Sequence, residues 1–255
     1  MAVPSLVGMV HLEALPGSPE FGGSMETILE RARSDARLLA DAGFDGIMVE
    51  NFGDAPFFAD DVPNVTVAAM SRAVAEVMTA GLPTGVNVLR NDGLAALAVA
   101  AATGASFIRI NVLSGTMYTD QGPIVGRAAE IARTRRTLCP DVDIMADVFV
   151  KHATPPAGLT LIDATNDLVE RAGANAVVVS GAGTGAPTDL DDLRTVARQS
   201  HLPVFVGSGA TPDTIASLLA IADGVIVGSA AKTGGIATNP VDPGRAASII
   251  AAAGR

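Results

Sequence analysis

The stretch that decides the fold is VFVGSGATPDTIASLLAIADGVIVGSAAK, residues Val204–Lys232. It contains two short β-branched runs, each followed by a turn of small residues, Gly207–Gly209 and Gly228–Ala230, with a helical pattern between them. Thr211 and Pro212 predict the start of that helix, because Thr is a favourable N-cap and Pro fits the first helical position. The order strand, helix, strand predicts two parallel strands whose Gly-rich turns lie at the same end.

Turns of this kind are suited to binding a phosphate group. Glycine lets the backbone approach an anion closely, and the N–H groups at a helix N-terminus carry partial positive charge. In barrels of eight βα units, a phosphate is frequently bound after strands 7 and 8. The alternative is that the glycines only permit tight turns. With the turn after the sixth predicted strand included, the expected phosphate-binding residues are Gly183, Gly207, Ser208, Gly209, Gly228, Ser229 and Lys232.

The same alternation extends along the whole chain. Apolar runs predict eight strands, at Leu6–His11, Gly46–Asn51, Thr84–Leu89, Phe107–Val112, Asp143–Val148, Ala176–Gly181, Val204–Gly207 and Gly224–Gly228. Helical patterns cover Met25–Ala42, Thr66–Ala80, Leu94–Thr103, Ile124–Leu138, Thr160–Ala172, Leu190–Gln199, Thr211–Ala220 and Pro243–Ala253. Strands that alternate with helices predict parallel βαβ units. We therefore expect a single domain over residues 1–255, folded as a (β/α)8 TIM barrel. A doubly wound open sheet is the alternative, but its Gly-rich fingerprint would follow the first strand.

Composition limits the classes of partner. The sequence is 49% hydrophobic and 17% charged, and its 17 basic and 27 acidic residues give a net charge of −10. Because basic residues form no cluster, we do not expect nucleic acid as a partner. The longest apolar stretch, around Leu94–Ala102, is far shorter than a membrane span, so we expect no integral membrane contact. The first twelve residues lack a secretory signal, and the single cysteine, Cys139, excludes an internal disulfide. We expect a cytoplasmic protein.

Polar residues interrupt the apolar strands near their C-terminal ends. Since side chains alternate across a strand, these residues should point into the barrel while their apolar neighbours pack against the outer helices. They are His11, Glu50, Asn87, Arg109, Asn111, Asp147 and Ser180. Burying a charge costs several kcal/mol unless it is paired or binds a ligand. The ring is therefore either a ligand site or a self-satisfied network of Arg109, Asp147 and Glu50.

Loops after the strands add further candidates. The segment Gly115–Gly122 is long enough to be a lid or a substrate loop. Lys151 has the same parity as Asp147, so it should project over the barrel mouth, where it can bind an anion, transfer a proton or form a Schiff base. The expected substrate-binding residues are Asn51, Asn87, Arg90, Asn91, Asn111, Asp120, His152, Ser180 and Thr184. A helix cap for Asp92 and a packed histidine for His11 are the structural alternatives.

Several of these segments resemble the BtpA family. The resemblance rests on VGMVHLEALPGSP, VENFGDAPF, GVNVLRND, FIRINV with TDQG, ADVFVKHA, VSGAGTG, VGSGAT, DGVIVGSAAK and NPVD, which occur in this order over nearly the whole chain. It implies a barrel of the ribulose-phosphate-binding type. Cyanobacterial relatives are described as photosystem I biogenesis factors, and SgcQ-type relatives lie among genes for sugar uptake and sugar phosphates.

We expect an enzyme that acts on a small phosphorylated metabolite, a sugar or nucleoside phosphate, as an isomerase, epimerase, lyase or hydrolase. The expected catalytic residues are Glu50, Asp147, Lys151, His11 and Arg109. Glu50 and Asp147 would act as acid and base, and Arg109 or Lys151 would stabilise negative charge. The alternatives are a non-catalytic assembly or regulatory factor and a metal-dependent hydrolase. No cofactor is assigned, and a divalent metal at Glu50, Asp147 and His11 lacks a supporting spacing motif. We also expect a homo-oligomer.

Overall fold

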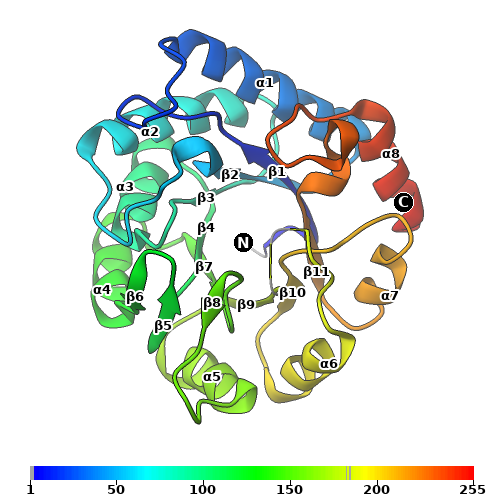
Figure 1. Ribbon diagram of the computed structural model, residues 1–255. Coiled ribbons are helices and arrows are strands. Elements are labelled where there is room, and N and C mark those ends of the chain that lie inside the picture. The colour runs from blue at the N-terminus through cyan, green and yellow to red at the C-terminus, as the bar shows by residue number, and fades with distance from the viewer. Residues whose placement is uncertain (1–2, 182, 184) are drawn as a thin grey trace.

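A computed structural model describes residues 3–181, 183 and 185–255. Within these residues, eight parallel strands close into a barrel (Figure 1). β1 closes it by pairing with both β2 and β11, so that Gly8 lies opposite Ile47 and Val227. In order around the barrel, the strands are β1 (Leu6–His11), β2 (Gly46–Glu50), β3 (Thr84–Asn87), β4 (Phe107–Ile110), β7 (Asp143–Asp147), β9 (Ala176–Val179), β10 (Val204–Val206) and β11 (Gly224–Val227). The predicted TIM barrel is confirmed.

Helices form a ring around these strands (Figure 1). α1 begins where Ser24 Oγ accepts a hydrogen bond from Thr27 N, and it ends at Gly43, whose φ of 102° suits glycine. The helices are α1 (Met25–Ala42), α2 (Asn64–Met78), α3 (Gly93–Thr103), α4 (Ala128–Leu138), α5 (Leu161–Asn166), α6 (Leu190–Gln199), α7 (Ile215–Leu219) and α8 (Pro243–Ala252). A π-helical turn over Asp167–Arg171 continues α5.

Two predicted helix starts are wrong. Residues 122–125 form strand β6 (Gly122–Val125), which pairs with β5 (Thr116–Thr119), so α4 begins only at Ala128. The predicted lid segment is therefore a β-hairpin. α7 begins at Ile215 rather than Pro212, because the preceding residues form a turn in which Thr214 Oγ1 accepts a hydrogen bond from Thr211 N (2.9 Å).

The core has two parts. Outward-facing strand residues such as Ile108 and Ile110 pack with the helices in a large apolar cluster. A smaller cluster fills the barrel interior, and it includes Met9, Met48 and Met145. Each of these methionines precedes a polar residue by two positions, so the predicted inward orientation of the polar ring agrees with the structure.

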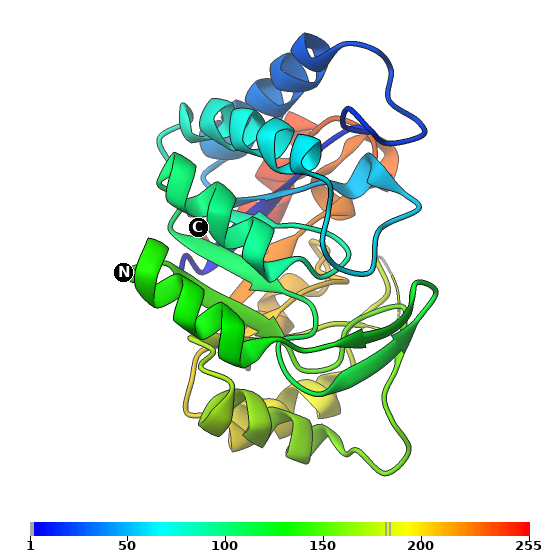
Figure 2. The ribbon, with the colours of Figure 1, turned by 90° about the vertical axis from the view of Figure 1, so that its left-hand side faces the viewer.

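A small antiparallel sheet lies beside the barrel mouth. Its strand order is β6, β5 and β8 (Ala153–Thr154). The pairing of β5 with β8 joins the segment that follows β4 to the segment that follows β7. Figure 2 shows this hairpin on the opposite side of the molecule from the N-terminus. In the described parts of the chain, no helix combines the length and apolar character that crossing a bilayer requires.

Candidate functional site

The centre of the barrel mouth is a fully buried ion pair. Arg109 donates from Nε to Asp147 Oδ2 (3.0 Å) and from Nη2 to Asp147 Oδ1 (2.7 Å). Ser180 Oγ donates to Asp147 Oδ1 (3.1 Å), and Asn111 Nδ2 donates to Asp147 Oδ2 (3.3 Å). Asp147 thus accepts four hydrogen bonds, which leaves it poorly placed to take a proton from a ligand. The structure does not bring it together with Glu50 as an acid–base pair.

The predicted asparagines brace the strand ends. Asn87 Nδ2 donates to Arg109 O (3.0 Å) and to Asn111 Oδ1 (3.1 Å). Asn51 Oδ1 accepts from Leu89 N (2.7 Å). Asn91 accepts from Val112 N and donates to Val112 O. Of this set only Asn111 lines a cavity, so positioning of neighbouring strands is the main role that their contacts support.

His11 ends β1 and faces the cavity. Its Nδ1 lies 2.9 Å from Ala237 O, which can only accept, so the proton resides on Nδ1 and Nε2 carries the lone pair. The ring stacks on Phe52 with centroids 4.7 Å apart. Burial and the positive charges of Lys232 and Lys151 lower the pKa of His11 to about 3. The imidazole is therefore neutral near pH 7.

Glu50 is the direct neighbour of His11. The two residues lie opposite one another in the β1–β2 register, and His11 Nε2 is 3.8 Å from Glu50 Oε1. Burial raises the pKa of Glu50, although the positive charges of Lys151 and Arg109 act against this. A carboxyl group with a raised pKa is suited to donating a proton. On adjacent strands, the lone pair of His11 Nε2 thus lies beside a carboxyl group whose pKa is raised.

Lys151 follows β7 and overlooks the same space. Burial and the neighbouring Arg109 charge lower its pKa, while Glu50 and Asp147 act in the opposite direction. Within the described residues, its ammonium group makes no ion pair closer than 4 Å. Lys151 is therefore available to a ligand, as its parity predicts.

A cavity of about 210 Å³ connects these groups with the two Gly-rich turns. Ser208, Gly209 and Ala210 line it after β10, and Gly228, Ser229 and Ala230 line it after β11; we call these six residues the cradle. Among the described residues, no group accepts a hydrogen bond from any of their six backbone N–H groups. Backbone N–H groups are normally paired, with protein or with water, so a set of N–H groups without acceptors beside one cavity is an arrangement that suits an anion.

Two glycines make the cradle's shape sterically specific. A Cβ atom at Gly207 would lie 2.6 Å from Val178 Cγ1 and 2.9 Å from Arg109 Nη2. Gly209 has a φ of 75°, and a Cβ there would lie 2.5 Å from Ala186 O. Both positions therefore need glycine for close packing, and Gly209 also needs it for its positive φ.

Other predicted phosphate-binding residues lie elsewhere or act differently. Lys232 is fully buried, and its Nζ donates to Asp35 Oδ2 (2.9 Å) on α1. This ion pair leaves it outside the cavity, so its expected role as a phosphate ligand is not what the structure supports. Ser208 Oγ accepts a hydrogen bond from Gly181 N (2.8 Å) and donates one to Ala186 O (3.2 Å). The hydroxyl group therefore links the loop after β10 to the loop after β9.

The remaining residues of the turn after β9 divide in the same way. Ser180 contacts Arg109 and Asp147, and Gly183 packs near the His152 ring rather than the cradle cavity. Thr184 lies outside the described residues. Gly185 does line the cavity.

Sequence reasoning missed Arg245, at the start of α8. Arg245 lines the cradle cavity, and its Nε donates to Ala230 O (2.9 Å). Asp242 Oδ1 caps the helix by accepting from Arg245 N (3.0 Å), which fixes the position of this residue. The available signal was that Arg245 is the only basic residue of the predicted last helix.

A second cavity of about 430 Å³ adjoins the first and shares Glu50, Phe52 and Lys151 with it. Its other lining residues include Arg90, Asp120, Gln121 and His152. Four predicted substrate-binding residues are therefore gathered in this second cavity, away from the cradle: Arg90, Asn111, Asp120 and His152.

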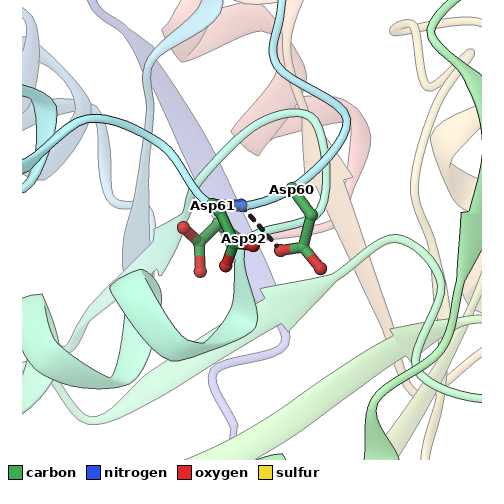
Figure 3. A group of neighbouring side chains, drawn as sticks. All are labelled: Asp60, Asp61 and Asp92. Atoms are coloured by element: carbon green, nitrogen blue, oxygen red, sulfur yellow. Dashed lines mark hydrogen bonds between the residues drawn. The ribbon is translucent and has the colours of Figure 1, made fainter.

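The alternative of a metal at Glu50, Asp147 and His11 finds no geometric support. In residues 3–181, 183 and 185–255, the group of three side chains whose ligand atoms lie within 4.8 Å of one another is Asp60, Asp61 and Asp92 (Figure 3). Arg127 Nη1 already pairs with Asp60 Oδ2 (3.1 Å) and Asp61 Oδ1 (3.0 Å). Asp92 caps α3 by accepting from Ala95 N. The cluster therefore has a guanidinium as its cation.

The order of these elements and residues matches a known sequence profile. The profile of the BtpA family matches residues 3–255. The chain belongs to the BtpA family. The photosystem I biogenesis protein BtpA of Synechocystis sp. is 46% identical over 249 residues, which cover 97% of this chain and 87% of that protein. An uncharacterised protein of Thermococcus kodakarensis is 47% identical over 247 residues, or 96% of this chain and 93% of that protein.

Solved structures show that this BtpA-family chain has a widespread barrel fold. Thiamine phosphate pyrophosphorylase from Pyrococcus furiosus is 13% identical with a TM-score of 0.60, over 98% of this chain and 95% of that chain. A 3-hexulose-6-phosphate synthase is 16% identical with a TM-score of 0.59, over 97% and 99% of the two chains. The expected (β/α)8 barrel is confirmed, and at these identities the likeness concerns the fold alone.

Proposed function

We propose that this BtpA-family protein is an enzyme whose substrate is a small phosphorylated metabolite, a sugar or nucleoside phosphate. The observation that carries the proposal is the cradle: its six residues line one cavity together with Arg245, and their backbone N–H groups have no acceptor among the described residues. A phosphate there would accept hydrogen bonds from the backbone and an ionic bond from the guanidinium.

The charge of the mouth supports the same conclusion. The protein carries a net charge of −10, yet Arg245, Lys151 and Arg109 line the cradle cavity. Asp147 neutralises Arg109, whereas Lys151 has no such partner among the described residues. A positive cavity in an acidic protein concentrates anionic ligands.

His11 and Glu50 would carry out the proton-transfer step on the substrate. Nε2 of neutral His11 would accept a hydrogen bond from a substrate O–H group, and the Glu50 carboxyl group would transfer a proton between neighbouring substrate atoms. Lys151 would stabilise the negative charge that develops on the substrate oxygen. Proton transfer between adjacent atoms is the common step of isomerisation, epimerisation and aldol-type cleavage. Asp147 would act as a positioning residue that holds Arg109.

Titration calorimetry with inorganic phosphate tests the cradle. We expect saturable binding to the wild-type protein and a Kd at least about tenfold weaker in Arg245→Gln, a loss of about 1.4 kcal/mol. Arg194→Gln is the matched control, because Arg194 is an exposed arginine that pairs with Asp191 on α6. If the wild type does not bind phosphate, or if Arg245→Gln binds it as tightly as the control does, the proposal fails.

A screen of phosphorylated sugars and nucleosides then identifies the substrate. We expect at least one compound to bind more tightly than inorganic phosphate and to be converted to product. A tightly bound phosphometabolite that is never converted would contradict the enzymatic part of the proposal.

A further inference from the structure

The second cavity contains a guanidinium without a carboxylate partner. Arg90 is only 6% exposed, and its Nη2 donates to Lys151 O (2.6 Å). In the described part of the chain, no carboxylate lies within 4 Å of its guanidinium nitrogens, although Glu50 and Asp120 line the same cavity. Arg109, in contrast, is buried against the two oxygens of Asp147.

This difference needs an explanation, because a buried unpaired charge is costly. A guanidinium offers five N–H donors in a planar fork that matches a carboxylate or a phosphate. One hydrogen bond to a carbonyl leaves most of that capacity unused. Arg90 also lines an open cavity of about 430 Å³, so its donors are within reach of a bound molecule.

Gln121 supplies an independent sign of a ligand in the same place. It lies in the turn of the β5–β6 hairpin and lines the second cavity. Its Oε1 is buried and has no hydrogen-bond donor among the described residues. Unsatisfied buried acceptors are rare in folded proteins, and this one would be satisfied by an N–H or O–H group of a ligand.

We propose that the second cavity is a second anion subsite, in which Arg90 binds a carboxylate or a second phosphate of the substrate. This inference rests on the proposed function, because it places the first phosphate in the cradle. The substrate is then a molecule with an anionic group at each end. Its central atoms lie beside Glu50 and Lys151, which line both cavities. Hydroxyl groups of the same molecule would donate to Gln121 Oε1.

Matched pairs of ligands test the inference by calorimetry. The pairs are 4-phosphoerythronate with erythrose 4-phosphate, 6-phosphogluconate with glucose 6-phosphate, and fructose 1,6-bisphosphate with fructose 6-phosphate. Within each pair, one member has the additional anionic group and the other does not. We expect the doubly anionic member of at least one pair to bind the wild-type protein about tenfold more tightly or better. The first two pairs report a carboxylate and the third reports a phosphate.

Variants of Arg90 assign the preference to this side chain. Arg90→Gln should reduce the ratio of the two Kd values to about one and leave the Kd of inorganic phosphate unchanged. Arg90→Lys keeps the charge without the planar fork, so it should retain an intermediate ratio; it also serves if Arg90→Gln does not fold. Arg72→Gln, which removes an exposed positive charge from α2, should keep the wild-type ratio.

The results that would contradict the second subsite differ from those that would contradict the proposed function. If wild-type protein binds inorganic phosphate but prefers no doubly anionic ligand, or if the preference survives in Arg90→Gln, the second subsite is wrong and the cradle stands. If wild-type protein does not bind inorganic phosphate, the proposed function itself is wrong.

Discussion

His11 and Glu50 end adjacent strands in direct register, with Nε2 of the one 3.8 Å from Oε1 of the other. Their environments shift the two pKa values in opposite directions. Burial keeps His11 neutral with its lone pair facing Glu50, and it raises the pKa of Glu50 toward the protonated form. The gap is too long for a direct hydrogen bond, so the two groups do not satisfy one another, and a substrate atom lying beside both could contact each of them.

Glu50→Gln tests this assignment. The amide cannot donate and regain a proton as a carboxyl group does, so turnover of an identified substrate should fall by at least about 100-fold. The Kd of inorganic phosphate should stay within twofold of wild type, since the cradle is untouched. Glu13→Gln replaces a half-exposed carboxylate outside both cavities and serves as the control. Retained turnover in Glu50→Gln would show that another group transfers the proton.

The pH dependence of stability tests the buried neutral state of His11. The pKa of His11 is about 3 in the folded protein and about 6.5 in an unfolded chain. Between these values the unfolded state binds the extra proton, so acidification favours unfolding by up to about 1.4 kcal/mol per pH unit. In His11→Asn, urea unfolding between pH 7 and 4.5 should show a shallower loss of stability. The Glu50 contribution has the opposite sign, being lost as pH rises, but it is present in both proteins. Parallel pH profiles would contradict a neutral buried His11.

Lys232→Met separates stability from binding. The substitution leaves Asp35 buried without its cation, so the free energy of unfolding should fall by about 3–5 kcal/mol. Asp35 also accepts from Val241 N (2.8 Å), so the connection between α1 and the last loop depends on it. The double variant Asp35→Leu with Lys232→Met should regain part of the loss. Urea titration measures these values, and an unchanged phosphate Kd in folded Lys232→Met would agree with its position outside the cavity.

Gly207→Ala tests how closely the barrel mouth is packed. The added methyl group would meet Val178, Arg109 and Ser180, so the free energy of unfolding should fall by about 1–3 kcal/mol. Gly22→Ala is the matched control, because nothing lies within 4 Å of a Cβ at that exposed glycine. Equal stability of the two variants in thermal unfolding would contradict the close packing.

The inward polar ring was predictable because strand parity is a local property. Alternation alone placed His11 and Glu50 at the barrel mouth, and the two Gly-rich turns indicated the cradle. The partners of Lys232 and Arg109 could not be predicted in the same way. Lys232 and Asp35 are 197 positions apart, and their contact depends on how α1 packs against the last loop. The alternation of side chains along each strand placed Arg109 and Asp147 on the inner face of the barrel. It left open whether they bind a ligand or one another.

The hairpin and Arg245 were missed for related reasons. Residues 124–138 have an apolar spacing that suits a helix, but Ile124 pairs with Met117 and packs beneath the small sheet. Local periodicity does not report such strand pairing. Arg245 reaches the cavity because the chain after β11 turns back toward Ala230, a path that only the folded loop determines.

The closure of the barrel between β1 and β11 has a consequence for biosynthesis. His11 and Glu50 emerge from the ribosome early, whereas the second cradle turn and Arg245 emerge close to residue 245. The pairing of Gly8 with Val227 joins these two parts. In a nascent chain, His11 and Glu50 are therefore joined to the second cradle turn and Arg245 only when β11 docks on β1. Ligand present during translation would stabilise only chains in which that docking has occurred, so it would select for finished barrels.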